Sequence, residues 1–197
     1  MPSGPARLLG FSLGAPAALC IAARWPERVE RLILVSPAAP PAPGDLRRMA
    51  GAPLFLAARR GPRALAAALR VQGALSRAAP SLLLRLMFAG EAPAERSLLR
   101  EKAVRDALVA GFQKTLGEGR AGYAAALSAY AASAADDPVS VRAPVEIVHG
   151  AEDSWVPLRM AERLAATLGP GSTLTVLPGR GHYGALRAAL AREAVRD

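Results

Sequence analysis

The 197-residue sequence lacks most of what a disulfide framework, a metal site or a membrane span requires. It contains one cysteine and two histidines, so no disulfide can form within the chain and a cysteine-based metal site is excluded. The cysteine, Cys20, has apolar neighbours and is expected to be buried as a small hydrophobe. Arginines interrupt the alanine-rich middle, so no apolar run reaches the roughly 18 residues of a membrane span. Arg7 and the nearby Gly and Pro residues also interrupt any signal peptide, and we expect a cytoplasmic protein.

Motifs for cofactors and for nucleic acids are also missing. The chain has no glycine-rich phosphate loop followed by lysine and no His/Cys ligand spacing, so neither a cofactor nor a metal is expected. The net charge of +9 could attract a polyanion, but aromatic residues make up only 5% of the chain and no nucleic-acid module is recognisable. A nucleic-acid partner is therefore not expected.

Short apolar runs bounded by Gly, Pro or Ser predict four strands, at residues 6–10, 31–35, 145–149 and 173–177. Their apolar residues are nearly continuous, which is typical of parallel strands that are covered on both faces. Helical patterns at 14–24 and 158–168 alternate with these strands. The rhythm predicts an α/β fold with a parallel sheet.

A long helical region interrupts this rhythm between residues 38 and 143. Leu, Val, Met and Phe recur at helical spacing in segments 63–75, 81–88, 94–116 and 121–134. An insertion of this length between two strands predicts a helical cap or lid. The expected organisation is thus a core formed by residues 1–37 and 144–197, with residues 38–143 as the cap.

The first motif that carries chemistry is Gly10-Phe11-Ser12-Leu13-Gly14, which lies between a predicted strand and a predicted helix. In a nucleophile elbow the serine occupies a sharp strand-to-helix turn, and small residues two before and two after it relieve the crowding there. The start of the following helix favours developing negative charge. Ser12 is therefore the candidate nucleophile.

Two later segments offer the acid and the base. Asp153 follows the strand at 145–149, at the end where parallel sheets gather functional side chains, although it could equally form a turn or cap the helix that starts near residue 157. The adjacent Glu152 would point elsewhere, and we prefer Asp153. The base has to be His149 or His182: His149 ends a strand and suits a structural role, whereas His182 is expected on a glycine-flanked loop that can direct its ring toward Ser12.

The order Ser12, Asp153, His182 is the chain order of α/β-hydrolases. Together with the elbow and the stretches at 22–37, 143–157 and 177–182, it makes the sequence resemble the α/β-hydrolase superfamily, in its cap-bearing branch of esterase-like and haloperoxidase-like enzymes. The resemblance implies a serine hydrolase acting on a small apolar acyl substrate such as a carboxylic ester. In it, His182 takes the proton of Ser12, Asp153 orients the imidazole, and the Leu13 backbone N–H is an oxyanion donor.

The resemblance also implies further strands before the elbow, together with a loop that supplies a second oxyanion amide. Eleven residues precede Ser12, so we expect a partial α/β-hydrolase fold in which this second donor is missing from the chain. A missing N-terminal segment or a homo-oligomer would then complete the sheet. The alternative function is a truncated, weakly active or inactive hydrolase-like protein that serves as a binding or interaction module.

Overall fold

The computed structural model describes residues 4–133 and 141–195 and contains a four-stranded sheet in the order β1-β2-β3-β4. The strands are β1 (Ala6–Phe11), β2 (Val29–Val35), β3 (Val145–Gly150) and β4 (Ser172–Leu177). All three neighbouring pairs are parallel. The four predicted strands and the parallel α/β sheet are confirmed, with ends that differ from the predicted ones by at most two residues.

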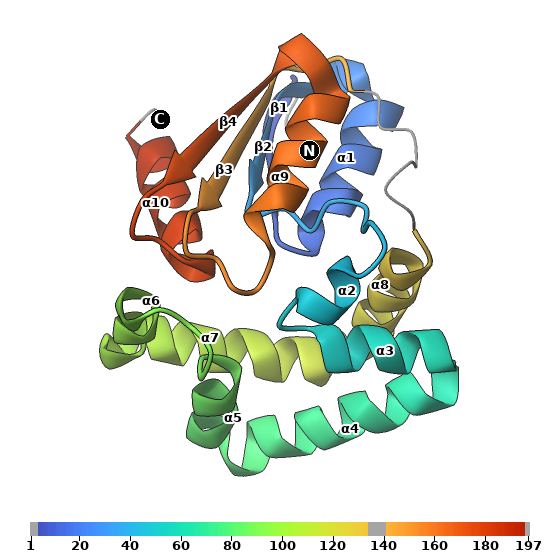
Figure 1. Cartoon of the computed structure of the whole chain (residues 1–197), viewed down its shortest axis with the longest axis vertical. Coiled ribbons are helices and arrows are strands. Elements are labelled where there is room, and N and C mark those ends of the chain that lie inside the picture. The colour runs from blue at the N-terminus through green and yellow to red at the C-terminus, as the bar shows by residue number, and fades with distance from the viewer. Residues whose placement is uncertain (1–3, 134–140, 196–197) are drawn as a thin grey trace.

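Helices cover both faces of this sheet (Figure 1). Side chains of β2 alternate between the faces: Leu32 and Leu34 belong to one buried cluster, whereas Ile33 and Val35 belong to another. The first cluster includes residues of α1 (Gly14–Arg24) and α9 (Leu158–Leu168), and the second includes residues of α10 (His182–Ala194). Burial on both faces explains why residues 32–35 of β2 are apolar without alternation.

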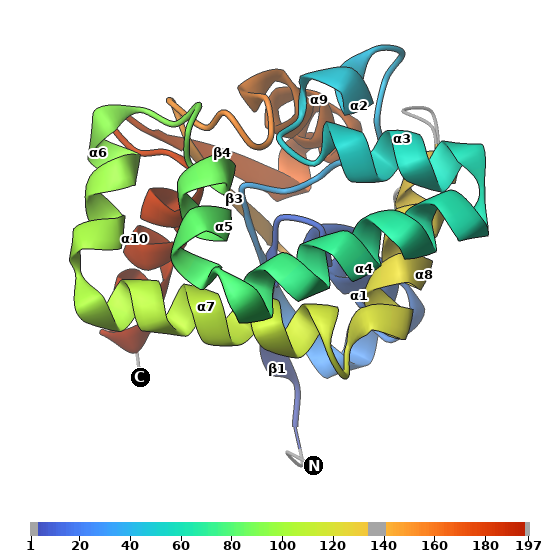
Figure 2. The ribbon, with the colours of Figure 1, turned by 90° about the horizontal axis from the view of Figure 1, so that it is seen from below.

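The chain between β2 and β3 is helical and lies beside the carboxyl ends of the strands (Figure 2). It contains α2 (Asp45–Arg48), α3 (Ala52–Arg60), α4 (Pro62–Ala78), α5 (Pro80–Met87), α6 (Pro93–Ser97), α7 (Lys102–Leu116) and α8 (Arg120–Ala132). Short 3-10 turns occupy Pro26–Arg28, Leu98–Arg100 and Gly169–Gly171. The last residue of the helix predicted at 121–134 lies outside the described residues.

The single helix predicted at 94–116 is wrong. The structure has α6, a 3-10 turn at Leu98–Arg100 and then α7, which starts after Glu101 in an extended conformation. No Gly or Pro marks this break in the sequence. The turn buries Leu98 and directs α6 toward α10, so contacts made elsewhere in the fold override the local helical pattern.

Buried side chains of the helical segment join the larger core cluster. Leu65 and Leu69 of α4, Leu116 of α7 and Leu127 of α8 are at most 2% exposed and belong to the same cluster as Leu32. These helices therefore share a core with the sheet.

A buried carboxylate also joins the start of the helical segment to the sheet's own helices. Asp45 accepts hydrogen bonds from Arg159 and Arg163 of α9 and from the Ala42 backbone N–H. Burial alone would raise the pKa of Asp45, but the two arginines and the amide outweigh it and lower the pKa. The ionised carboxylate thus holds α2 against α9.

Cys20 corrects a further expectation. Helix α1 buries Ala15, Ala18, Leu19 and Ala22, and at about 100° per residue Cys20 falls on the opposite side. Its side chain is exposed, so the prediction of a buried thiol is wrong. Among residues 4–133 and 141–195, no helix is both long and apolar enough to cross a membrane.

Candidate active site

Ser12 lies between β1 and α1 in a strained backbone conformation. Its φ is 52°, in the left-handed region that non-glycine residues rarely adopt and that costs about 1–3 kcal/mol. Three hydrogen bonds hold this backbone: the Ser12 N–H donates to Val35 O at 3.0 Å, and the Ser12 carbonyl accepts from Ala15 N and Ala38 N at 3.0 Å each. The turn is therefore fixed from β2, from the chain just after β2 and from α1.

The two glycines of the motif differ in what requires them. A Cβ on Gly10 would lie 2.7 Å from the Ala18 Cβ, so a side chain there would push α1 away from β1. A Cβ on Gly14 would meet nothing within 4 Å, because this residue faces the open cleft described below. The expectation that crowding requires both glycines holds for Gly10 and is wrong for Gly14.

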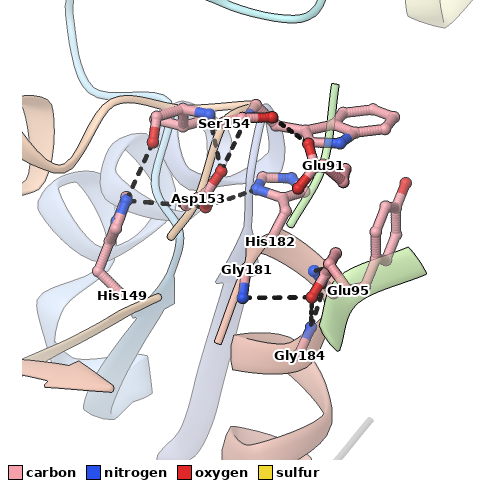
Figure 3. Close-up of polar contacts among 11 residues, drawn as sticks. Glu91, Glu95, His149, Asp153, Ser154, Gly181, His182 and Gly184 are labelled. Atoms are coloured by element: carbon pink, nitrogen blue, oxygen red, sulfur yellow. Dashed lines mark hydrogen bonds and ion pairs between the residues drawn. The ribbon is translucent and has the colours of Figure 1, made fainter. Parts of the chain in front are cut away.

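Asp153 lies in the loop after β3 with a fully buried side chain. Its Oδ1 accepts hydrogen bonds from the backbone N–H groups of Trp155 and Val156, both at 2.9 Å. Its Oδ2 lies 2.8 Å from Nδ1 of His182 (Figure 3). The sequence offered a turn-forming role and a role as partner of the histidine as alternatives for Asp153. Different oxygens of the one carboxylate make these two sets of contacts.

His182 is the first residue of α10, and the expectation of a loop residue is wrong at this point. The loop ends at Gly181, and the helix begins with the histidine itself. The side chain is 1% exposed, with the Trp155 ring stacked at 5.3 Å between centroids and the Phe11 ring at 4.6 Å. These aromatic contacts hold the imidazole plane.

The loops that carry Asp153 and His182 approach each other closely at Gly150. A Cβ on Gly150 would lie 2.3 Å from the carbonyl oxygen of Arg180 and 2.6 Å from that of Gly181. The Arg180 carbonyl also accepts a hydrogen bond from the Glu152 N–H at 3.0 Å. Glycine at the end of β3 therefore brings the two loops together.

The charge state of Asp153 decides which nitrogen of His182 carries a proton. Burial alone would raise the pKa of Asp153, but His182, His149 and the amide hydrogen bonds outweigh it and lower the pKa. An ionised carboxylate only accepts hydrogen bonds, so Nδ1 of His182 donates to it. When the ring carries one proton, that proton is on Nδ1 and Nε2 is an acceptor.

His149 has a different environment. Its side chain is fully buried, and Nε2 lies 3.0 Å from the Val156 carbonyl oxygen and 3.7 Å from Oδ2 of Asp153. Since a carbonyl only accepts, Nε2 is the protonated nitrogen. Burial lowers the pKa of His149 and keeps the ring neutral. His149 braces the Asp153 loop and is far less suited to proton transfer than His182.

Ser12 and His182 line one cleft of about 980 Å³, together with Leu13, Phe112, Tyr123 and Trp155. The described residues include no hydrogen bond between the side chains of Ser12 and His182. In known enzymes the contact between a nucleophile and its base is often long without ligand and tightens in the substrate complex. Within the same part of the chain, the Leu13 amide donates to no acceptor, so it remains available to the cleft.

Two glutamates of the helical segment, Glu91 and Glu95, contact the site and were not predicted from the sequence (Figure 3). Glu91 accepts a hydrogen bond from the Ser154 hydroxyl, beside Asp153, and burial raises the pKa of Glu91. Glu95 accepts hydrogen bonds from backbone amides around His182. Nothing in the local pattern distinguishes either residue from an ordinary surface glutamate, and the fold alone brings them to the site.

A family model described as serine aminopeptidase, S33, matches residues 1–183 of the chain. No curated protein sequence matches this chain.

Solved structures of hydrolases are similar to the chain in fold. An α/β hydrolase enzyme from a Medee basin deep-sea metagenome library has a TM-score of 0.61 at 18% identity, covering 98% of this chain and 64% of its own. A thermophilic esterase from Thermogutta terrifontis has a TM-score of 0.58 at 21% identity, covering 98% and 65%. A hydrolase from Pseudomonas aeruginosa has a TM-score of 0.57 at 22% identity, covering 96% and 62%. The chain thus spans less than two thirds of the length of each of these proteins.

Proposed function

The chain belongs to the serine aminopeptidase S33 family of the α/β-hydrolase superfamily, and from this premise we propose that it is a serine hydrolase of carboxylic esters or related acyl compounds. Ser12 is the nucleophile, His182 the general base and Asp153 the residue that orients the base. The observation that carries the proposal is the hydrogen bond of 2.8 Å between His182 Nδ1 and Asp153 Oδ2, at a cleft that Ser12 also lines.

The chemistry follows from the tautomer of His182. Its Nε2 accepts the Ser12 proton while Oγ forms a bond to the substrate carbonyl carbon, and Asp153 stabilises the resulting imidazolium. The imidazolium then returns the proton to the leaving group as the bond to it breaks, which leaves an acyl-Ser12 ester. Water attacks this ester by the same steps in reverse and releases the acid.

The Leu13 amide supplies one oxyanion donor, since it directly follows the nucleophile at the start of α1. Removing one such donor costs about 10²–10³ in rate. A reagent that reports one covalent event does not require complete turnover, so it is a better first assay than steady-state hydrolysis.

The cleft favours an apolar acyl group. Leu13, Leu108, Phe112 and Trp155 line it, and much of this wall comes from α7 in the helical segment. We propose that residues 38–143 act as a cap that selects the substrate by size and apolar character. The family description adds aminoacyl amides to the substrates worth testing.

The test is labelling of the 197-residue protein with a fluorophosphonate, followed by hydrolysis of short p-nitrophenyl esters and aminoacyl p-nitroanilides. Ser12→Ala should abolish labelling, and His182→Ala should slow it by several orders of magnitude, while circular dichroism stays unchanged. Ser133→Ala is a matched control, because this half-buried serine lies at the end of α8, away from the cleft lining. Labelling that persists in Ser12→Ala would refute the nucleophile. A folded wild-type protein that takes no label would favour the binding module.

A further inference from the structure

Helix α10 begins with His182 but has no capping side chain of its own. Its N-cap residue is Gly181, which has no side chain to accept hydrogen bonds from the first amides of the helix. A Ser, Thr, Asp or Asn at this position can accept from the second or third helical residue. Here those residues are Tyr183 and Gly184, directly after the histidine.

The carboxylate of Glu95, on α6, takes the place of the missing N-cap side chain. Its Oε1 accepts from Tyr183 N and Gly184 N, and its Oε2 accepts from Gly181 N and Gly184 N. The two contacts with Gly184 measure 3.2 and 3.1 Å. Figure 3 shows this carboxylate between the Gly181 and Gly184 amides, beside the histidine.

Burial and charge make this contact strong. Glu95 is 2% exposed, and ionised acceptors of backbone amides form shorter and stronger hydrogen bonds than neutral ones. The positive end of the α10 dipole also favours a negative charge here.

The surrounding sequence fits a carboxylate that arrives from another element. A Cβ on Gly181 would lie 2.8 Å from Glu95 Cδ, and a Cβ on Gly184 would lie 2.9 Å from Glu95 Oε2. Neither glycine has a positive φ. Their small size is therefore explained by the approach of Glu95 and not by backbone conformation.

We propose that Glu95 is a positioning residue: from the helical segment at 38–143 it caps the N-terminus of α10 and thereby holds the His182 imidazole against Asp153. The catalytic part of this inference rests on the proposed function, whereas the effect on the His182–Asp153 hydrogen bond does not. The consequence is that the histidine is correctly placed only when α6 is docked on α10. A substrate that moves α6 would then change the activity of the site.

The first readout is independent of activity. The proton on His182 Nδ1, which is shared with Asp153, gives a far-downfield proton NMR resonance that persists only while it is protected from exchange. Glu95→Ala should broaden or remove this resonance. The proton on His149 Nε2, which is bonded to Val156 O, is an internal reference in the same spectrum and should be retained.

The second readout is the rate of fluorophosphonate labelling. Glu95→Ala should slow it by about 10²-fold, the loss that a misplacement of about 1 Å can produce. Glu101→Gln is the matched control, because Glu101 is an exposed carboxylate of the same segment that also contacts α10, through Arg187 at 2.5 Å. It should leave both readouts unchanged.

Two further variants separate capping from a general loss of packing. In Glu95→Ala, the space beside Gly181 is free, so adding Gly181→Asp places a carboxylate where it can accept from Tyr183 N and Gly184 N. This double variant should recover the His182 resonance and most of the labelling rate. Gly184→Ala improves helix propensity but displaces Glu95. Introduced alone, it should reduce both readouts. Added to Glu95→Ala, it should reduce neither of them further.

The outcomes distinguish the two proposals. An intact His182 resonance in folded Glu95→Ala, or no recovery in the double variant, would overturn the positioning role. A wild-type protein that shows the resonance but takes no label would overturn the serine hydrolase proposal alone. If Glu95→Ala does not fold, the Gly184→Ala variant still decides, since an unchanged resonance there would also overturn the positioning role.

Discussion

Replacing Asp153 by Asn should nearly abolish activity, and the structure explains why the new amide would have only one orientation. Oδ1 of Asp153 accepts from two backbone amides, those of Trp155 and Val156. The amide oxygen of Asn must occupy this position, because its NH₂ group cannot accept a hydrogen bond. The NH₂ group is then forced to face Nδ1 of His182, where Oδ2 lies at 2.8 Å in the wild type.

The magnitude follows from the tautomer that this orientation imposes. With a donor opposite it, Nδ1 of His182 has to accept, so the ring proton moves to Nε2. Nε2, the nitrogen proposed to take the Ser12 proton, then already carries a proton and cannot take another. Loss of the correct tautomer in a Ser-His-Asp triad costs about 10⁴ in rate, which corresponds to roughly 5.5 kcal/mol of transition-state stabilisation.

The assay compares second-order labelling rates with a fluorophosphonate for wild type, Asp153→Asn and Glu152→Gln. Glu152 is the matched control, since it is the neighbouring carboxylate and its side chain is exposed. Its variant should label at the wild-type rate. An Asp153→Asn protein that labels within tenfold of the wild type would refute the assignment of Asp153, and a slow Glu152→Gln would point to the other carboxylate.

Three further predictions concern stability. Gly10→Ala should lower the free energy of unfolding by about 1–3 kcal/mol, because the new Cβ would lie 2.7 Å from a side chain of α1. Gly14→Ala should leave the free energy of unfolding unchanged, because a Cβ there meets nothing within 4 Å. Equal effects of the two variants in urea titrations would contradict this difference in packing. Leu69→Ala should lower the free energy of unfolding by about 2–5 kcal/mol, because Leu69 is fully buried. Val71→Ala on the same helix should change it by at most about 0.5 kcal/mol, because Val71 is 70% exposed. Chemical denaturation measures both values, and equal losses in the two variants would argue against the packing of α4. His149 has a pKa below 6.5 in the folded state, so the unfolded chain takes up a proton on this ring first as the pH falls. The contribution of His149 to stability therefore decreases as the pH drops below about 6.5. The difference in free energy of unfolding between wild type and His149→Gln should become smaller from pH 8 to pH 5.5, and a constant difference would refute a buried neutral ring.

The strands and the helices next to them could be predicted because their signals are local. A strand such as 145–150 is buried along its whole length and largely apolar because both of its faces are covered, and Gly or Pro marks its ends. The same holds for α1 and α9, whose bounds agree with the predicted 14–24 and 158–168. The break between α6 and α7 had no such signal, since it depends on where α6 meets α10.

The order of the chemical groups can be read from local patterns: a serine in an elbow, an aspartate after a strand and a histidine after the next strand, in a chain with two histidines. Local patterns also predict the parallel sheet, whose carboxyl ends bring those groups to one edge. That His182 begins a helix, and that each Asp153 oxygen has a different role, depends on the packing of the whole fold. The same packing brings Glu95 to the amides around the histidine, 86 to 89 positions away. A helical or strand period reports which face of an element is buried, whereas a hydrogen bond between distant elements depends on how those faces pack, and no local pattern encodes that.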